Sequence, residues 1–211
     1  MRPIIFVRVA DMKYYKGITE QDKPVNGGSY VKETGFAHEC YNFDAVIEDG
    51  CETEKCLGFF MMTGKNTQEL HIEKMPGCSL LKEEEQIMDV NVVFVSKAMG
   101  SKTMRVVGFY KNAIAYRHPH YMSFENDYKQ EYLFEAEKNN CVVLPYSTRF
   151  SSNNWYVPSS TANGSTFGFG RANVWYAGSE GATQEEISYV EKIISSIDSY
   201  AEDNWINRKG E

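Results

Sequence analysis

The segment from His38 to Asn42 carries side chains suited to acid–base or ligand chemistry. Its sequence, His-Glu-Cys-Tyr-Asn, approaches the H-E-x-x-H pattern of zinc proteases, but Asn42 stands where the second histidine is needed. That motif works by placing two imidazoles one helical turn apart on a zinc ion, so a metalloprotease is not expected. His38 and Glu39 could instead act as acid and base on a small substrate, or form hydrogen bonds to the edge of a ligand. The plain alternative is a structural histidine buried with a partner.

Aromatic residues make up 14% of the chain and often occur as neighbours, as in Trp155-Tyr156 and Trp175-Tyr176. Neighbours in a strand face opposite sides of the sheet, so one member of each pair should point away from the core. An outward ring can stack on a flat ligand such as a nucleobase. We therefore predict a pocket built from residues 38–42, the turn at residues 27–30 and at least one of Trp155 and Trp175. The competing interpretation places both tryptophans in the core. The predicted ligand-binding residues are Tyr14, Gly28, Tyr30, His38, Glu39, Asn42, Trp155, Asn173 and Trp175.

The charge of the chain is unevenly distributed. The formal net charge is −7, which makes the whole chain a poor non-specific binder of nucleic acid. Residues 91–120 nevertheless carry five basic and no acidic side chains, and residues 41–90 carry four basic against eleven acidic ones. We predict that the basic residues of the first stretch face outward, lie near one another and contact phosphates; the alternative is that strands expose them at turns and edges. These predicted backbone contacts are Lys97, Lys102, Arg105, Lys111 and Arg117.

Cysteine usage and hydropathy limit the cellular locations and the cofactors to be expected. The five cysteines are an odd number without a Cys-x-x-Cys pair, and no histidine lies at a zinc-finger distance from a cysteine pair. Free thiols in a reducing cytosol are therefore expected, with no metal and no other cofactor. No apolar run reaches the roughly 18 residues of a membrane span, and the apolar run near the N-terminus is too short for a signal peptide. We expect a cytoplasmic protein without a membrane partner.

Short apolar and β-branched runs, separated by turn residues, must position these groups. A chain of 211 residues without an internal linker predicts a single domain over 1–211, with a polar tail at about 203–211. Lys111-Asn112 is interpreted as a turn, and residues 147–173 as a long loop that is functional or mobile. The predicted strands cover residues 4–9, 41–47, 57–62, 90–95, 104–110, 113–116, 132–136, 141–145 and 174–177.

The clearest helix signal lies near the C-terminus. Thr183 is a candidate N-cap, and Glu186 three residues later would complete a capping box. Apolar residues then recur at helical spacing, and their stripe should pack on the sheet, namely Ile187, Val190, Ile193, Ile194, Ile197 and Tyr200. The fold class predicted is α+β, a curved and mostly antiparallel sheet or small β-barrel with a C-terminal amphipathic helix.

Several short segments carry a resemblance to known families. Residues 12–17 read Met-Lys-Tyr-Tyr-Lys-Gly, residues 27–31 read Gly-Gly-Ser-Tyr-Val, and residues 35–39 read Gly-Phe-Ala-His-Glu. Together with residues 106–113 and 173–177 they resemble modules found ahead of HNH-type nuclease domains in bacterial defence proteins. The Val-Val-Gly-Phe-Tyr segment at residues 106–110 is also similar to a strand of the PUA-like group, which includes EVE, YTH and SRA domains.

In that group a small barrel holds a flipped, modified base in an aromatic pocket. The resemblance therefore implies a nucleic-acid-binding module that recognises a modified or flipped base in DNA or RNA, acts in restriction, and has a nuclease partner. The chain departs from the pattern because it lacks an H-N-H segment and is more acidic than a typical DNA reader. A binding module is favoured over an enzyme. The alternatives are a small-molecule enzyme that uses His38 and Glu39, and a protein-interaction module that uses the acidic residues of 44–89.

Overall fold

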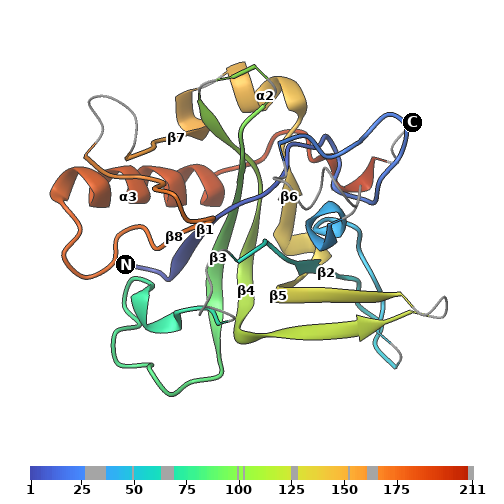
Figure 1. The fold of residues 1–211 in the computed structure, drawn as a ribbon, viewed down its shortest axis with the longest axis horizontal. Coiled ribbons are helices and arrows are strands. Elements are labelled where there is room, and N and C mark those ends of the chain that lie inside the picture. Colours follow the sequence, from blue (N-terminus) through green and yellow to red (C-terminus); the bar gives the residue numbers. More distant parts are fainter. Residues whose placement is uncertain are drawn as a thin grey trace.

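A computed structural model describes most of the chain (Figure 1). The described residues are 1–26, 37–48, 50–62, 69–98, 100–101, 103–124, 128–151, 153–160 and 166–208. The predicted site residues Gly28, Tyr30 and Lys102 lie outside them. No helix in the described part of the chain combines the length and the apolar character needed to cross a membrane.

The described strands form one mixed sheet of eight strands with the order β2-β5-β4-β3-β1-β8, in which β6 and β7 also pair with β4. Strand β1 runs parallel to β3, and the other pairs are antiparallel. The α+β class is thus confirmed, and the sheet is open at β2 and β8. The strands are β1 (Ile4–Arg8), β2 (Lys55–Gly58), β3 (Gln86–Ser96), β4 (Met104–Ser123), β5 (Lys129–Glu137), β6 (Cys141–Val143), β7 (Tyr156–Val157) and β8 (Val174–Trp175).

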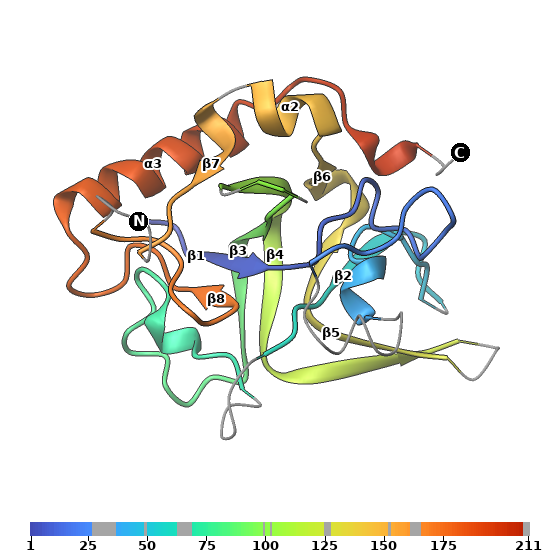
Figure 2. The ribbon, with the colours of Figure 1, turned by 45° about the horizontal axis from the view of Figure 1, so that its top comes forward.

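Strand β4 is the spine of the sheet, with 20 residues. One edge pairs with β3, while the other edge carries β7, then β6, then β5 in turn. The predicted turn at Lys111-Asn112 is wrong, because β4 continues through it. The register jumps there from Tyr110↔Val92 to Ala113↔Val90, so two residues of β4 oppose Asn91 alone. Asn112 has φ 50°, a left-handed conformation that asparagine tolerates, and the two residues form a β-bulge. Beyond it β4 pairs with β5 as a hairpin that projects from the sheet (Figures 1 and 2).

One face of the sheet is covered by helix α3 (Gln184–Asp198), as Figure 2 shows. The Thr183 hydroxyl accepts a hydrogen bond from the Glu186 N–H (3.2 Å), so the predicted N-cap is confirmed. The Glu186 carboxylate accepts from the Gly178 N–H (3.0 Å) instead of completing the capping box. The buried stripe is Val190, Ile193 and Ile197, whereas the predicted members Ile187 and Ile194 are only half-buried at its border.

Residues 146–151 and 153–157 form helices and a strand where a loop was predicted for residues 147–173; residues 152 and 161–165 of that prediction lie outside the described residues. The elements are helix α2 (Tyr146–Ser151), the 3₁₀ turn η4 (Asn153–Trp155) and strand β7. Trp155 and Val157 from this stretch join the same core as α3. Trp155 and Val157 therefore contribute to the core of the helix face, and the Ser- and Asn-rich composition of the stretch did not reveal that packing.

The opposite face is covered by segments with little regular structure, among them the 3₁₀ turns η1 (His38–Tyr41) and η2 (Ile72–Lys74). The strand predicted at residues 41–47 is wrong; Val46 alone forms a bridge, to Lys55. The physical reason is Asn42, whose side chain donates to the Phe59 carbonyl (2.9 Å) and accepts from the Phe59 N–H (2.8 Å). The side-chain amide thus takes the place of a strand neighbour. Two further 3₁₀ turns are η3 (Lys138–Asn140) and η5 (Trp205–Asn207).

Candidate functional site

The sheet separates the predicted tryptophans from the turn η1. Trp155 is only 4% exposed and stacks on Phe109, with ring centroids 5.9 Å apart. Trp175 packs on Phe6 (4.9 Å) in the same core beneath α3. Residues of η1 belong to the core of the opposite face. Among the described residues, the segment 38–42 and the two tryptophans thus lie in cores on opposite faces of the sheet, and Trp155 takes the competing core role; the turn at residues 27–30 lies outside the described residues.

Asn42 and Glu39, both predicted ligand contacts, are buried and hold the backbone together. Asn42 binds Phe59 as described, and the Tyr110 hydroxyl donates to the Asn42 carbonyl. The Glu39 carboxylate accepts from the Ala10 N–H (2.7 Å) and from the Met61 N–H. Burial raises the pKa of Glu39 to about 7, and these two N–H groups limit the rise. Asn173 joins the same network, because its side-chain amide donates to the Met61 carbonyl (2.9 Å).

His38 is half-buried and faces β5. Its Nδ1 accepts from the Glu131 N–H (3.3 Å) and lies 3.4 Å from the Tyr128 hydroxyl, while its Nε2 lies 3.8 Å from the Glu131 carboxylate. Burial lowers the pKa of His38, and Glu131 opposes that shift. His38 thus contacts β5 while the Glu39 carboxylate binds the end of β1. These contacts do not bring the two side chains together as an acid–base pair.

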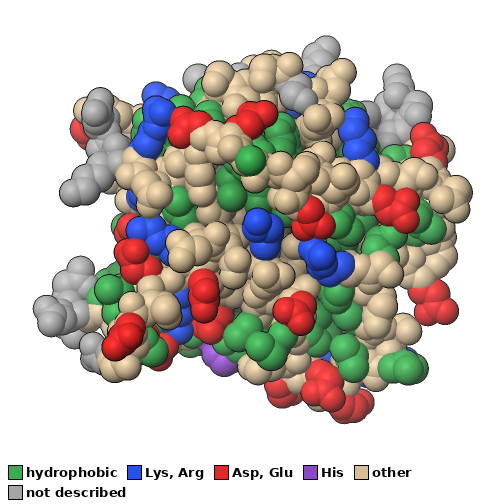
Figure 3. All heavy atoms as spheres, turned by 180° about the vertical axis from the view of Figure 1, so that it is seen from behind, with side chains coloured by type: hydrophobic (Ala, Val, Ile, Leu, Met, Phe, Trp, Pro, Cys, Tyr) green, Lys and Arg blue, Asp and Glu red, His purple; other side chains and the backbone are tan. Residues whose placement is uncertain are grey.

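The structure brings together only part of the predicted basic patch. Lys97 follows Ser96, which pairs with Arg105, so these two lie at neighbouring strand ends, and Lys102 lies outside the described residues. Arg117 was expected to face outward and is 7% exposed; it donates to the Leu81 and Glu84 carbonyls and pairs with Glu73 at 3.1 Å. Arg105 lies twelve residues before Arg117 on β4, about 40 Å away along an extended strand. Its guanidinium lies over the ring of Tyr156, 5.4 Å from the ring centroid. Lys97 is exposed and Lys111 half-buried. Among the described side chains on the face drawn in Figure 3, Lys and Arg are scattered between acidic residues.

A cavity of about 700 Å³ lies where the β4–β5 hairpin meets η1 and β2. We call it the hairpin pocket. Its described lining combines three aromatic rings with two aliphatic side chains, one carboxylate and one amide. These residues are Tyr41, Asp44, Val46, Leu57, Phe124, Tyr128 and Gln130. Of them, the sequence analysis named none as a ligand contact, although Tyr41 lies inside the segment 38–42 that it singled out.

The three rings lie against one another, and two of them are stacked. Phe124 and Tyr128 are stacked at 25° with centroids 5.7 Å apart, and Tyr41 lies 5.5 Å from Tyr128 at 43°. The hairpin positions the first two, because the Phe124 N–H donates to the Tyr128 carbonyl (2.8 Å). Gln130 is 2% exposed; its amide donates to the His38 carbonyl (2.9 Å), and its oxygen accepts from the Tyr128 hydroxyl. Burial raises the pKa of the Tyr128 hydroxyl, which keeps this donor protonated.

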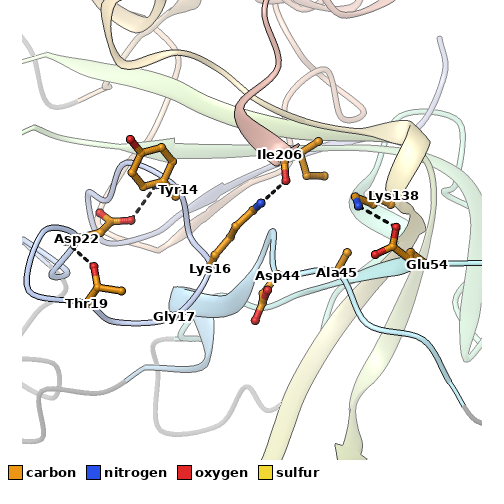
Figure 4. Close-up of a pocket in the computed structure, with 10 residues that line it drawn as sticks. All are labelled: Tyr14, Lys16, Gly17, Thr19, Asp22, Asp44, Ala45, Glu54, Lys138 and Ile206. Carbon is orange, nitrogen blue, oxygen red and sulfur yellow. Dashed lines mark hydrogen bonds and ion pairs between the residues drawn. The ribbon is translucent and has the colours of Figure 1, made fainter. Parts of the chain in front are cut away.

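A second cavity of about 340 Å³, the polar pocket, shares Asp44 with the hairpin pocket. Figure 4 shows Lys138 paired with Glu54 and Lys16 directed at the carbonyl of Ile206. The Lys16 ammonium donates to the carbonyls of Ile206 and Arg208, and Lys138 pairs with Glu54 at 2.7 Å. Tyr14, another predicted contact, also lines this cavity and stacks on Trp205 (5.2 Å). The Lys16 ammonium is thus engaged by the C-terminal segment.

In the described part of the chain, no cluster of three His, Cys, Asp or Glu side chains could hold a metal ion. The five cysteines are free, and only Cys51 among them is exposed.

Comparison of the chain with models of protein families, with curated proteins and with solved structures finds no match. The function must therefore follow from the chain's own residues. The hairpin pocket is the candidate site, because it joins stacked rings to a cavity large enough for a flat ligand.

Proposed function

We propose that the chain is a nucleic-acid-binding module that takes an unpaired or flipped base into the hairpin pocket. The observation that carries this proposal is the cluster of three aromatic rings, Phe124 stacked on Tyr128 and Tyr41 tilted against it, along one cavity of about 700 Å³. Each base has a flat π-face, and stacking on an aromatic side chain is worth about 1–3 kcal/mol. The apolar side chains Leu57 and Val46 line the same cavity, as suits a site from which a base excludes water.

The proposal keeps the predicted class of ligand but changes the residues that bind it. The tryptophans are replaced by Tyr41, Tyr128 and Phe124, which come from η1 and the hairpin. A PUA-like relationship, a role in bacterial defence and a nuclease partner are parts of the proposal that rest on the resemblance of the sequence alone. A cytoplasmic location is proposed on the same footing, and the free thiols agree with it.

Phosphate contacts contribute little to this mode of binding. The described lining of the pocket holds a carboxylate and no Lys or Arg, and the predicted phosphate contacts do not form one patch. Affinity that depends on phosphate neutralisation falls steeply with salt, roughly in proportion to the number of contacts. We therefore expect binding of a single-stranded oligonucleotide to weaken only shallowly as salt is raised.

The test replaces the central ring of the cluster. Tyr128→Leu should weaken binding of a short single-stranded oligonucleotide about 5- to 150-fold, as the loss of roughly 1–3 kcal/mol of stacking implies. Tyr128→Phe should retain most of the affinity, because the ring remains. Tyr121→Leu is the matched control, since Tyr121 lies on the same hairpin, is 63% exposed and does not line the pocket.

Fluorescence anisotropy titrations against a panel of modified and unmodified oligonucleotides would measure these affinities. Thermal melts of the three variants would show that each is folded. Equal binding by the Tyr128→Leu and Tyr121→Leu variants would contradict a role for the hairpin pocket, and absence of binding to the whole panel would contradict a nucleic-acid function.

A further inference from the structure

The hairpin pocket has the features of a site for a positively charged ring. We propose that it selects nucleobases that methylation at a ring nitrogen makes cationic at neutral pH, such as 1-methyladenine and 3-methylcytosine. This inference rests on the proposed function, because it names the ligand of the same pocket. It concerns selectivity between bases, which the stacking argument alone leaves open.

The first observation is the charge of the lining. Asp44 is the one formally charged side chain among the described residues that line the pocket. Burial raises the pKa of Asp44 and nearby Lys16 opposes the rise. The Lys16 ammonium itself is bonded to the carbonyls of Ile206 and Arg208 in the polar pocket, as Figure 4 shows for Ile206. Asp44 is exposed at the rim of the hairpin pocket, where it supplies the formal charge of the described lining, and Lys16 is the basic group near it.

The second observation is the nature of the rings. Two of the three are phenols held neutral, since burial raises the pKa of both Tyr41 and Tyr128. The face of an aromatic ring carries negative electrostatic potential and attracts a cation placed over it. A base with delocalised positive charge thus gains both from stacking on the rings and from the carboxylate of Asp44.

The third observation concerns the amide in the pocket. Gln130 is the described lining residue with an amide that could read the edge of a neutral base, but its groups already have partners. Its nitrogen donates to the His38 and Glu131 carbonyls (2.9 and 3.2 Å), and its oxygen accepts from the Tyr128 hydroxyl. We therefore expect the pocket to distinguish stacked bases by their charge more than by the hydrogen-bonding groups along the edge of the base.

Two pairs of isomeric bases isolate the charge. 1-Methyladenine is cationic at neutral pH and N6-methyladenine is neutral, although both carry one methyl group; 3-methylcytosine and 5-methylcytosine form a second such pair. Each base is placed at the centre of the same short single-stranded oligonucleotide, and affinity is measured by fluorescence anisotropy at pH 7. We expect the cationic member of each pair to bind about 5- to 30-fold more tightly, the range of a desolvated cation–π contact.

Asp44→Asn tests the carboxylate, because it keeps the shape of the side chain and removes its charge. The preference for the cationic isomer should fall at least about threefold, while affinity for the neutral isomer stays unchanged. Glu54→Gln is the matched control, since Glu54 lines the polar pocket and is paired with Lys138, and the preference should persist in it.

The outcomes separate this inference from the proposed function. Equal affinity for both members of each pair, together with loss of binding in Tyr128→Leu, would overturn charge selection and leave base binding in place. No binding of any of the four oligonucleotides would overturn both. An undiminished preference in Asp44→Asn would overturn the part assigned to that carboxylate.

Discussion

The two faces of the sheet are stabilised in different ways. Beneath α3 the contacts are apolar, and Val190, Ile193 and Ile197 pack on the sheet without buried charge from the helix. On the other face the covering segments have little regular secondary structure, so buried polar side chains form hydrogen bonds with the backbone groups there. Asn42 and Glu39 bind backbone groups far away in the sequence. A loop-covered face needs such side chains because buried backbone groups must be paired.

The difference matters for the candidate site. The core beneath the helix is apolar, whereas the hairpin pocket lies between η1 and the hairpin. Irregular segments held by a few polar anchors can be shaped around a ligand, while a helix packed on a sheet cannot without losing its core. Three stability measurements test whether the anchors and the helix stripe contribute as this comparison requires.

The largest effect is expected at Arg149, the anchor of residues 11–13. Its guanidinium is fully buried and donates to the carbonyls of Met12 and Lys13 (both 2.6 Å) and of Leu144 (3.1 Å). Arg149→Met should lower the free energy of unfolding by about 3–5 kcal/mol, because carbonyl groups and the nearby Asp11 lose their buried partner. Urea denaturation measures this loss.

Arg208→Met is the control for Arg149. Arg208 pairs with Asp203 at 2.7 Å, but both side chains are more than half exposed. Exposed pairs contribute about 0–1 kcal/mol, so this variant should unfold close to the wild type. If Arg149→Met lost as little free energy of unfolding as Arg208→Met, the anchors of the loop-covered face would be dispensable.

The next effect tests the helix face. Ile193 is fully buried and Ile194, its neighbour, is half-buried at the border of the stripe. Ile193→Ala should cost about 2–5 kcal/mol. Ile194→Ala should cost about 1–2 kcal/mol, because less apolar surface leaves water there on folding. Calorimetry of both variants checks the order, and a greater loss at Ile194 would mean that the stripe is rotated on the sheet.

The sequence predicted the elements whose signals are local. The Thr183 cap and the apolar period of α3 lie within one segment, and both are present. The bulge at Asn112 was interpreted as a turn because asparagine is common in both, and its left-handed φ is shared by both. Only the pairing of β4 with β3 on both sides of the bulge distinguishes them. The strand predicted at residues 41–47 was wrong because the side chain of Asn42 forms hydrogen bonds with the backbone of Phe59, seventeen residues away.

The candidate site was less predictable because its residues meet only in the tertiary structure. Tyr41 belongs to a segment that was singled out, but for its neighbours His38, Glu39 and Asn42. Phe124 and Tyr128 flank the end of the hairpin. The strand predicted at residues 132–136 leaves out the first residues of β5, so it did not reveal that end of the hairpin. Trp155 was taken for an outward ring, yet the face to which a residue turns depends on η4 and β7, which the sequence did not reveal.

The smallest effect is a pH dependence carried by Glu39. Its pKa in the folded protein is raised to about 7 from an ordinary value of 4.5, mainly because burial disfavours the charged form. The folded state therefore holds this proton more tightly than the unfolded state does. The resulting stabilisation is fully present below pH 4.5 and is lost as the pH rises through 7. With 1.36 kcal/mol for each pKa unit, the loss between pH 5 and pH 8 is about 2–3 kcal/mol.

Glu39→Gln keeps the shape of the protonated side chain and cannot ionise, so it should remove this part of the pH dependence. Urea denaturation at pH 5 and pH 8 gives the free energy of unfolding of both proteins, and the wild type should lose about 2–3 kcal/mol more than the variant between the two pH values. The exposed carboxyl of Glu180 provides the control, since Glu180→Gln should follow the wild type. If the Glu39→Gln protein lost stability in parallel with the wild type, the Glu39 carboxyl would titrate normally. The anchor between η1 and the end of β1 would then be open to water, and the loop-covered face would be looser than its buried hydrogen bonds indicate.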